Sequence, residues 1–211
     1  VVNSSGVTTF TGAVGSKTAL SSLTTDAGGE VNVNGGSVTT TGEQVFNDAL
    51  KMSVSTTLKG SAVKFYATAT GTGALIVDGA ASIKGGTVTT TGAQTYKGAV
   101  TLESDAVISS SGGGDIAFMS TVDGAQVLTV NTSGVTTFAS TVGGTSPLTS
   151  LITDESGSVR VGANSIKTTG LQSFNDAALQ RLGRVRLLRR AVLLLHLLQQ
   201  ELDLGGVVEL G

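Results

Sequence analysis

The segment VNSSGVTTF at residues 2–10 returns as VNTSGVTTF at residues 130–138 and opens a longer repeat. Residues 2–49 align without a gap to residues 130–177, at a constant offset of 128 positions and with 27 identities in 48 pairs. An internal repeat usually decides the architecture of a chain, so it is the first guide to this fold. Because repeated chains are more often scaffolds than catalysts, we expect a structural role.

Short strands separated by glycine turns are the expected local structure of residues 1–177. This region is rich in Thr, Val and Gly, which favour pleated strands and tight turns. Residues 7–10, 31–33 and 63–65 are such strands, because apolar residues broadly alternate with polar or small ones. Strands of this length suit a sandwich, a barrel or a solenoid. The repeat favours the solenoid, because only there does each coil stack on a similar neighbour.

Shorter echoes show that the repeat unit is itself composite. Residues 35–50 return as residues 85–100, a shift of 50, and residues 63–65 return as residues 116–118, a shift of 53. With about 20–25 residues per coil, we expect a parallel β-helix of about seven to nine coils spaced at roughly 4.8 Å.

The predicted interior consists of apolar positions that keep their character in both copies. The first copy supplies Val7, Phe10, Leu20, Leu23, Val31, Val33, Val38 and Phe46. The second copy supplies Val135, Phe138, Leu148, Leu151, Val159, Val161, Ile166 and Phe174. Predicted surface positions change more, as in Glu30 to Ser158 and Asn32 to Arg160.

The pattern stops after residue 177, so we divide the chain into a solenoid region, 1–177, and a tail, 178–211. The tail has no Ser or Thr but contains twelve Leu and five of the six Arg of the chain. Its composition predicts a short α-helical segment that ends at Gly205 and Gly206. This helix would cap the last coil or, with its arginines beside leucines, lie on a membrane surface. Alternatively, the tail is translated out of frame.

Charge and composition exclude several kinds of function. The net charge is −2 and Arg160 is the single Arg in residues 1–177, so we expect no nucleic-acid binding. With no Cys and His196 as the lone His, the usual catalytic triads and zinc sites cannot form. The sequence contains no run of 18 apolar residues, so we expect no membrane-spanning helix. We therefore assign no catalytic, metal-binding or cofactor-binding residues and expect no enzyme activity.

Recurring polar residues have simpler explanations than a site. Asp26 and Asp154, like Asp48 and Asp176, are equivalent in the repeat, which favours corners where Asp bonds its own backbone. The carboxylates of Asp78, Asp115 and Asp123 are scattered along the sequence.

Three weaker motifs favour turns or surface strands. Residues 112–115 favour a turn over a calcium site, and Asn3 and Asn131 begin glycosylation-like triplets that a turn also explains. The Thr runs 39–41 and 89–91 resemble ice-binding rows, but Lys167 interrupts the third copy. Because these runs are far apart in the chain, we expect no array with one row per coil.

The phrases SGVTTF, LTTDAGG and VDGAQVLTVN resemble the repeats of very large bacterial surface proteins, the filamentous-haemagglutinin-like and autotransporter-like adhesins. The resemblance covers residues 1–177 and implies an exported, right-handed β-helical stalk. The partners it implies are glycans or proteins of a host or neighbouring cell. Val1 lies inside a repeat unit and no signal peptide is visible, so we expect an internal fragment of a longer chain. The alternative is a carbohydrate-binding or carbohydrate-active β-helix, which needs charged side chains converging in a groove.

Overall fold

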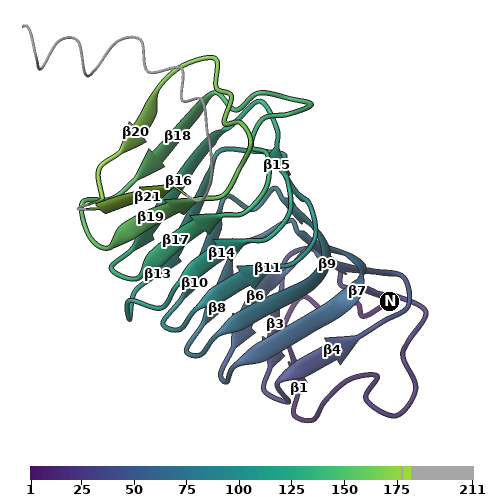
Figure 1. Cartoon of the computed structure of the whole chain (residues 1–211). Helices are drawn as coiled ribbons and strands as arrows, with labels where there is room; N and C mark the ends of the chain where they lie inside the picture. The colour runs from purple at the N-terminus through teal and green to yellow at the C-terminus, as the bar shows by residue number, and fades with distance from the viewer. Residues whose placement is uncertain (177, 182–211) are drawn as a thin grey trace, which may run out of the picture.

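The chain folds as a stack of β-strand coils that forms a rod (Figure 1). The structure is a computed structural model that describes residues 1–176 and 178–181, with only the backbone of the last four. The architecture is an all-β parallel β-solenoid of about 8 turns. This confirms the predicted all-β parallel solenoid and the predicted number of coils.

One side of the rod, which we call face A, is a 9-stranded sheet to which each coil contributes one strand. In the order of the stack, its strands are β1 (Val7–Phe10), β3 (Glu30–Val33), β6 (Ala49–Met52), β8 (Ala69–Gly71), β10 (Thr87–Thr90), β13 (Ala106–Ser110), β16 (Val127–Thr132), β18 (Ser150–Thr153) and β20 (Gln172–Phe174).

The second sheet bends around a corner and forms two further sides, faces B and C. Face B holds β4 (Ser37–Thr39), the first parts of β7 (Thr56–Phe65) and β9 (Leu75–Ile83), β11 (Gln94–Tyr96), β14 (Ile116–Phe118), β17 (Val135–Phe138), β19 (Ser158–Val161) and β21 (Ala178–Arg181). Face C holds β2 (Leu23–Thr24), β5 (Glu43–Phe46), the second parts of β7 and β9, β12 (Val100–Leu102) and β15 (Val122–Asp123).

The long strands β7 and β9 show where the corner lies. The first part of β9 pairs with β11 and its second part with β12, so the strand belongs to both faces. The register between β7 and β9 shifts between Lys59 and Ala62, where the chain turns. The rod is therefore three-sided.

The strand pairings of the described residues are parallel, as stacked coils require. The length of a coil follows from the residues that pair on face A. Leu50 pairs with Ala69 in one coil step, and Leu128 pairs with Leu151 in another. The first step lies just below the predicted range of about 20–25 residues per coil, and the second lies within it. Coil length varies because the corners take up extra residues.

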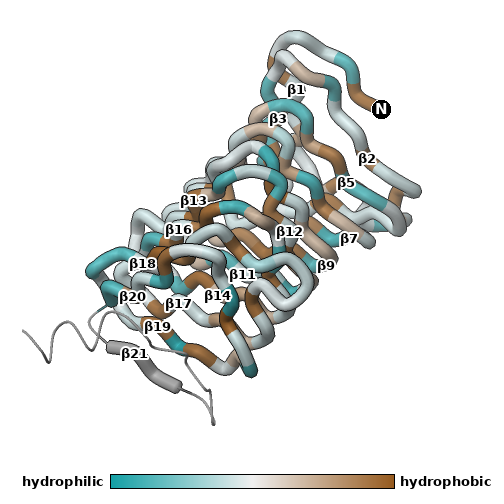
Figure 2. The backbone as a smooth tube through the Cα atoms, turned by 90° about the horizontal axis from the view of Figure 1, so that it is seen from above, coloured by the Kyte–Doolittle hydropathy of each residue, from teal (hydrophilic) through white to brown (hydrophobic). Residues whose placement is uncertain are grey.

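The core is a single apolar column inside the rod. Figure 2 shows hydrophobic residues recurring along the tube from coil to coil. Along most strands buried residues alternate with partly exposed ones, as in β3 and β19, because successive side chains of a strand point to opposite faces. Ten of the sixteen residues predicted for the interior are buried: Leu23, Val31, Val33, Val38, Phe46, Phe138, Leu148, Leu151, Val159 and Val161.

The prediction was wrong for Val7 and Val135, which point outward at the start of β1 and β17. In both copies of Val-Thr-Thr-Phe the valine lies three positions before the phenylalanine. With a period of two, the valine and the phenylalanine therefore point to opposite sides. Thr136 is buried instead of Val135, beside Phe138.

The remaining predicted core residues lie near the ends of the described stack, where fewer coils cover them. Leu20 is 39% exposed, and Phe10, Ile166 and Phe174 pack only partly against the core.

The two copies of the repeat do not occupy the same side of the rod. The VTTF strand β1 of the first copy lies on face A, whereas its equivalent β17 lies on face B. Likewise β3 on face A corresponds to β19 on face B, and β5 on face C corresponds to β20 on face A. From β1 to β17 the chain passes through six coils and then one further face, so the second copy is rotated by a third of a turn.

Aromatic side chains stack inside face B. Tyr96, Phe118 and Phe138 pair in register, with ring centroids 5.2 and 5.3 Å apart and nearly parallel rings. Phe46 and Phe65 stack similarly inside face C, at 6.3 Å. Each ring covers the next, so equivalent inward positions stabilise neighbouring coils.

The solenoid continues slightly beyond residue 177. Residues 178–181 form strand β21, which pairs with β19, so the first four residues of the tail are extended. The expected helix otherwise falls on residues 182–211, which lie outside the described residues.

Candidate functional site

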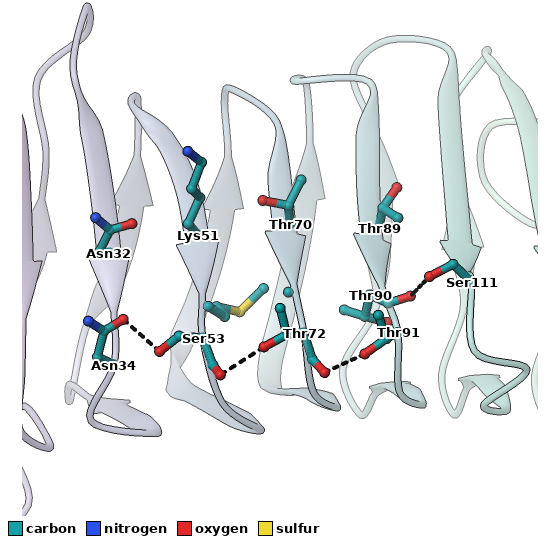
Figure 3. A pocket seen from close by; sticks show the side chains of 12 residues that line it. Asn32, Asn34, Lys51, Ser53, Thr70, Thr72, Thr89, Thr90, Thr91 and Ser111 are labelled. Atoms are coloured by element: carbon teal, nitrogen blue, oxygen red, sulfur yellow. Dashed lines mark hydrogen bonds between the residues drawn. The ribbon is translucent and has the colours of Figure 1, made fainter.

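The most distinctive surface feature is a trough that runs along face A, parallel to the rod axis (Figure 3). It lies between two rows of outward side chains, each with one residue per coil. Rank one consists of Thr9, Asn32, Lys51, Thr70, Thr89, Ser109 and Asn131, which are register partners in the sheet. Rank two consists of the residues two positions further on: Thr11, Asn34, Ser53, Thr72, Thr91, Ser111 and Ser133.

Two hollows lie along this trough. The first has a volume of about 340 Å³ and runs from Asn32 to Ser111, with Met52, Gly71 and Thr90 among its lining residues. The second, about 280 Å³, continues from Ser109 to Asp154 and shares Ser111 with the first. The two hollows together follow the ranks over most of the rod.

The rank-two wall is held by hydrogen bonds from coil to coil. The Ser53 hydroxyl donates to Asn34 Oδ1 at 2.7 Å, and the Thr72 hydroxyl donates to the Ser53 carbonyl at 2.7 Å. The Thr91 hydroxyl then donates to the Thr72 carbonyl. Figure 3 shows this chain of bonds crossing four coils. The middle of rank two is therefore rigid, and the hydroxyl protons of Ser53, Thr72 and Thr91 are already used.

The rank-one wall keeps its polar groups available. The Thr70 hydroxyl has only a long contact of 3.5 Å with the Leu50 carbonyl, and the Lys51 ammonium pairs with Glu30 at 2.5 Å. No hydrogen bond within the described residues engages the side chains of Asn32, Thr89, Ser109 or Asn131. Figure 3 shows the Thr89 hydroxyl directed away from rank two and the Thr70 hydroxyl directed toward the neighbouring strand.

The Thr runs 39–41 and 89–91 begin on different faces, in β4 and β10, and form no shared array, as expected; a polar array with one row per coil nevertheless forms on face A, where other residues flank the second run. Thr89 and Thr91 have as neighbours Thr70 and Thr72 on one side and Ser109 and Ser111 on the other. The sequence offsets of 50 and 128 hid this array, because neither is a whole number of coils.

Charge separates face A from the other two faces. Strands β8, β10, β13 and β16 contain no charged residue. On faces B and C, Lys97 pairs with Asp78 at 3.2 Å and Lys64 with Glu43 at 2.9 Å. The hydrogen bond to Glu43 raises the pKa of Lys64. The middle of the trough is therefore neutral, while the rest of the rod carries mixed charge.

The recurring aspartates lie at corners, as expected, but they bond to a neighbouring coil and not to their own backbone. The amide of Ser4 donates to Asp26 Oδ1 at 2.8 Å, and the amide of Thr132, the equivalent of Ser4, donates to Asp154 Oδ1 at 3.1 Å. The Gly29 amide donates to Asp48 Oδ1 at 2.7 Å.

Three other carboxylates are placed as follows. Asp123 accepts from the amides of Thr145 and Ser146. Asp78 forms the surface ion pair with Lys97. Burial raises the pKa of Asp176, the equivalent of Asp48.

Sequence reasoning missed a buried glutamine at one corner of the coil. Gln44, in the segment TTTGEQVF, is fully buried, and its amide donates to the carbonyls of Val38 at 3.0 Å and Lys59 at 2.8 Å. Gln94 does the same for Val88 at 3.3 Å and Ser109 at 2.7 Å. Its recurrence in each copy, at 44, 94 and 172, was the available signal. The glutamine fastens one coil to the next.

The acceptor side of the two glutamines differs. The hydroxyl of the buried Tyr96 donates to Gln94 Oε1 at 2.7 Å, and burial raises the pKa of this tyrosine far above its ordinary value. The first copy has Phe46 at the equivalent position, and Gln44 Oε1 is buried without a partner among the described residues. The Thr136 hydroxyl is in the same state.

The other motifs do not gather into a site. Asp115, at the end of the glycine run, accepts from the Val135 amide at 2.8 Å, as a structural corner would. Asn3 is exposed before β1, and Asn131 lies within β16 as part of rank one. His196 lies outside the described residues.

Within residues 1–176 and 178–181, no group of three His, Cys, Asp or Glu could hold a metal ion, and no helix is long and apolar enough to span a membrane. In comparisons with known proteins, no family model, curated protein or solved structure matches this chain.

Proposed function

We propose that this chain is a non-catalytic stalk module of a large exported bacterial surface protein, one that holds adhesive regions away from the cell. In this proposal the coils are right-handed, because connections between parallel strands of one sheet are right-handed in about 98% of cases. Its place is the cell surface or the extracellular medium, as the resemblance of residues 1–177 to filamentous-haemagglutinin-like and autotransporter-like adhesins implies.

The third-of-a-turn rotation between the copies is the observation that carries the proposal. Val31 and Val33 of β3 on face A and their equivalents on face B, Val159 and Val161 of β19, are all buried. The outward residue between them changes from Asn32 to Arg160. A catalytic surface needs fixed outward groups, whereas a rod needs only a conserved inside. Between the two copies the buried residues stay apolar, while the outward residues change.

The distribution of charge also favours a rod over a carbohydrate-active enzyme. A glycoside hydrolase needs two carboxyl groups facing one another across a cleft. The larger hollow contains Lys51 as the one charged residue of its lining, and the other has Asp154 alone. The aspartates of the corners are occupied by backbone amides of neighbouring coils. The described surface therefore suits a passive spacer.

Removing one whole coil tests this proposal. Leu50 pairs with Ala69, so deleting residues 51–69 joins equivalent positions and leaves the stacking in phase. We expect a folded rod that is shorter by about 4.8 Å in small-angle scattering, with cooperative unfolding preserved. As the control, deleting residues 51–60 removes half a coil and should destroy the fold. A whole-coil deletion that unfolds the chain, or cleavage of any polysaccharide by the intact chain, would reject the stalk.

A further inference from the structure

We propose that the trough of face A binds a neutral, linear polysaccharide chain lying along the rod axis. This inference rests on the proposed surface function and names the ligand class and the place where it would be held.

The first support is the shape of the hollows. They lie end to end between the same two ranks and share Ser111, so the space is a channel that is open along the rod. From Asn32 to Asn131 it extends over five coil steps, about 24 Å at the spacing of parallel strands. An extended polymer fills such a channel, whereas a compact ligand would leave most of it empty.

The second support is the state of the polar groups. In rank two, Ser53, Thr72 and Thr91 use their hydroxyl protons between coils and form a fixed wall. In rank one the Thr89 and Ser109 hydroxyls and the Asn131 amide each have unused donors and acceptors. A polysaccharide offers hydroxyls that also donate and accept, at regular intervals along its length. The repeated, free groups of rank one match that chemistry.

The third support is the absence of charge in the centre. The strands under Thr70, Thr89, Ser109 and Asn131 contain no Lys, Arg, Asp or Glu, while faces B and C carry ion pairs. A sulfated or uronate polymer would gain no counter-charge there, so the ligand is neutral. No aromatic ring is among the residues lining the trough. Affinity therefore depends on the number of coils that the polymer spans.

Binding to soluble polysaccharides tests the proposal directly. The intact chain would be run by affinity electrophoresis in gels containing amylose, a soluble β-glucan, a mannan or, for comparison, heparin. We expect retardation by at least one neutral polymer and none by heparin. Thr89→Asp places a charge in rank one and should weaken binding about fivefold or more, the equivalent of one lost hydrogen bond.

Thr95→Asp is the matched control. Thr95 lies in β11 of the same coil, on face B between Ile76 and Ala117, and is similarly half-buried. It should bind as the unchanged chain does, and equal thermal unfolding of the two variants would show that both are folded.

Several results would overturn the trough as a glycan site. These are the absence of binding to every neutral polymer, preference for heparin, and equal loss in both variants. Inhibition of ice growth without polysaccharide binding would assign the ranks to an ice surface instead. None of these outcomes affects the coil-deletion experiment, so the stalk can stand while this inference falls.

Discussion

Two corners of the rod carry the same motif and differ by one oxygen atom. At Gln94 the amide group donates to two carbonyls and its oxygen accepts from the Tyr96 hydroxyl. At Gln44 the donor side is also satisfied, but Phe46 replaces the tyrosine and Gln44 Oε1 has no partner among the described residues. A buried polar atom without a partner costs about 1–3 kcal/mol. Both corners therefore keep the bonds that the glutamine amide donates between coils, whereas the bond to the glutamine oxygen is present only at Gln94.

The largest effect is expected from removing the glutamine. Gln94→Leu leaves the carbonyls of Val88 and Ser109 and the Tyr96 hydroxyl without their partner. We expect the free energy of unfolding to fall by about 4 kcal/mol, and by about 3 kcal/mol for Gln44→Leu, where no acceptor bond is lost. Chemical denaturation measures both. Negligible effects would mean that the glutamines do not fasten the coils, and equal losses would mean that the Tyr96 hydrogen bond adds nothing to stability.

The next largest effect is expected at high pH, where only the corner with Tyr96 should lose stability. Because burial raises the pKa of Tyr96 in the fold, the unfolded chain loses this proton first, above about pH 10. Stability should then fall by about 1.4 kcal/mol per pH unit from this residue. In denaturation curves at increasing pH, Tyr96→Phe should lose this part of the slope. An unchanged slope in the variant would contradict the burial of an un-ionised tyrosine.

Tyr96→Phe makes the second corner resemble the first. It leaves Gln94 Oε1 buried without a donor, so we expect a loss of about 1–2 kcal/mol at neutral pH. The stack of Phe118 on this ring should persist, since the ring is unchanged. Near-ultraviolet circular dichroism checks the packing and denaturation checks the stability. A stabilised variant would show that the buried Tyr96 hydroxyl destabilises the fold.

The reverse change, Phe46→Tyr, should give the smallest effect and the opposite sign. Its hydroxyl would reach Gln44 Oε1 as Tyr96 reaches Gln94, for a gain of about 1 kcal/mol. Phe65→Tyr is the control, because its inward neighbour two positions back is Val63 and offers no acceptor. We expect the control to be destabilised. If both variants shift the melting temperature in the same direction, the new hydroxyl at position 46 does not bind Gln44 Oε1 as Tyr96 binds Gln94.

Period-two alternation predicted the inward residues of the strands well, including Val31, Val33 and Phe138. The same alternation places Val7 outside the rod, because Val7 lies three positions before Phe10 and therefore points to the opposite side of the strand. The glutamines were missed because a polar side chain suggests a surface position. Their recurrence in each copy, which the inward residues share, was the signal for a buried position.

The trough of face A was missed for a topological reason. Thr70 and Thr89 become neighbours because they lie one coil apart, and neither sequence offset is a whole number of coils. Coil length depends on corner insertions, so the sequence repeat alone did not predict which outward residues meet.

The central claim is that rank one runs straight along a stack of coils and that the second copy is rotated to another face. The chain has no cysteine, so pairs of spin labels can be placed at will. With one label at Asn131 and the other at Thr70, Lys51, Asn32 or Thr9, electron–electron distances should rise by about 4.8 Å per coil. A label at Thr137, the repeat equivalent of Thr9, should fall off that line. Distances that do not grow with coil number, or a Thr137 label aligned with rank one, would contradict the rod and its rotated repeat.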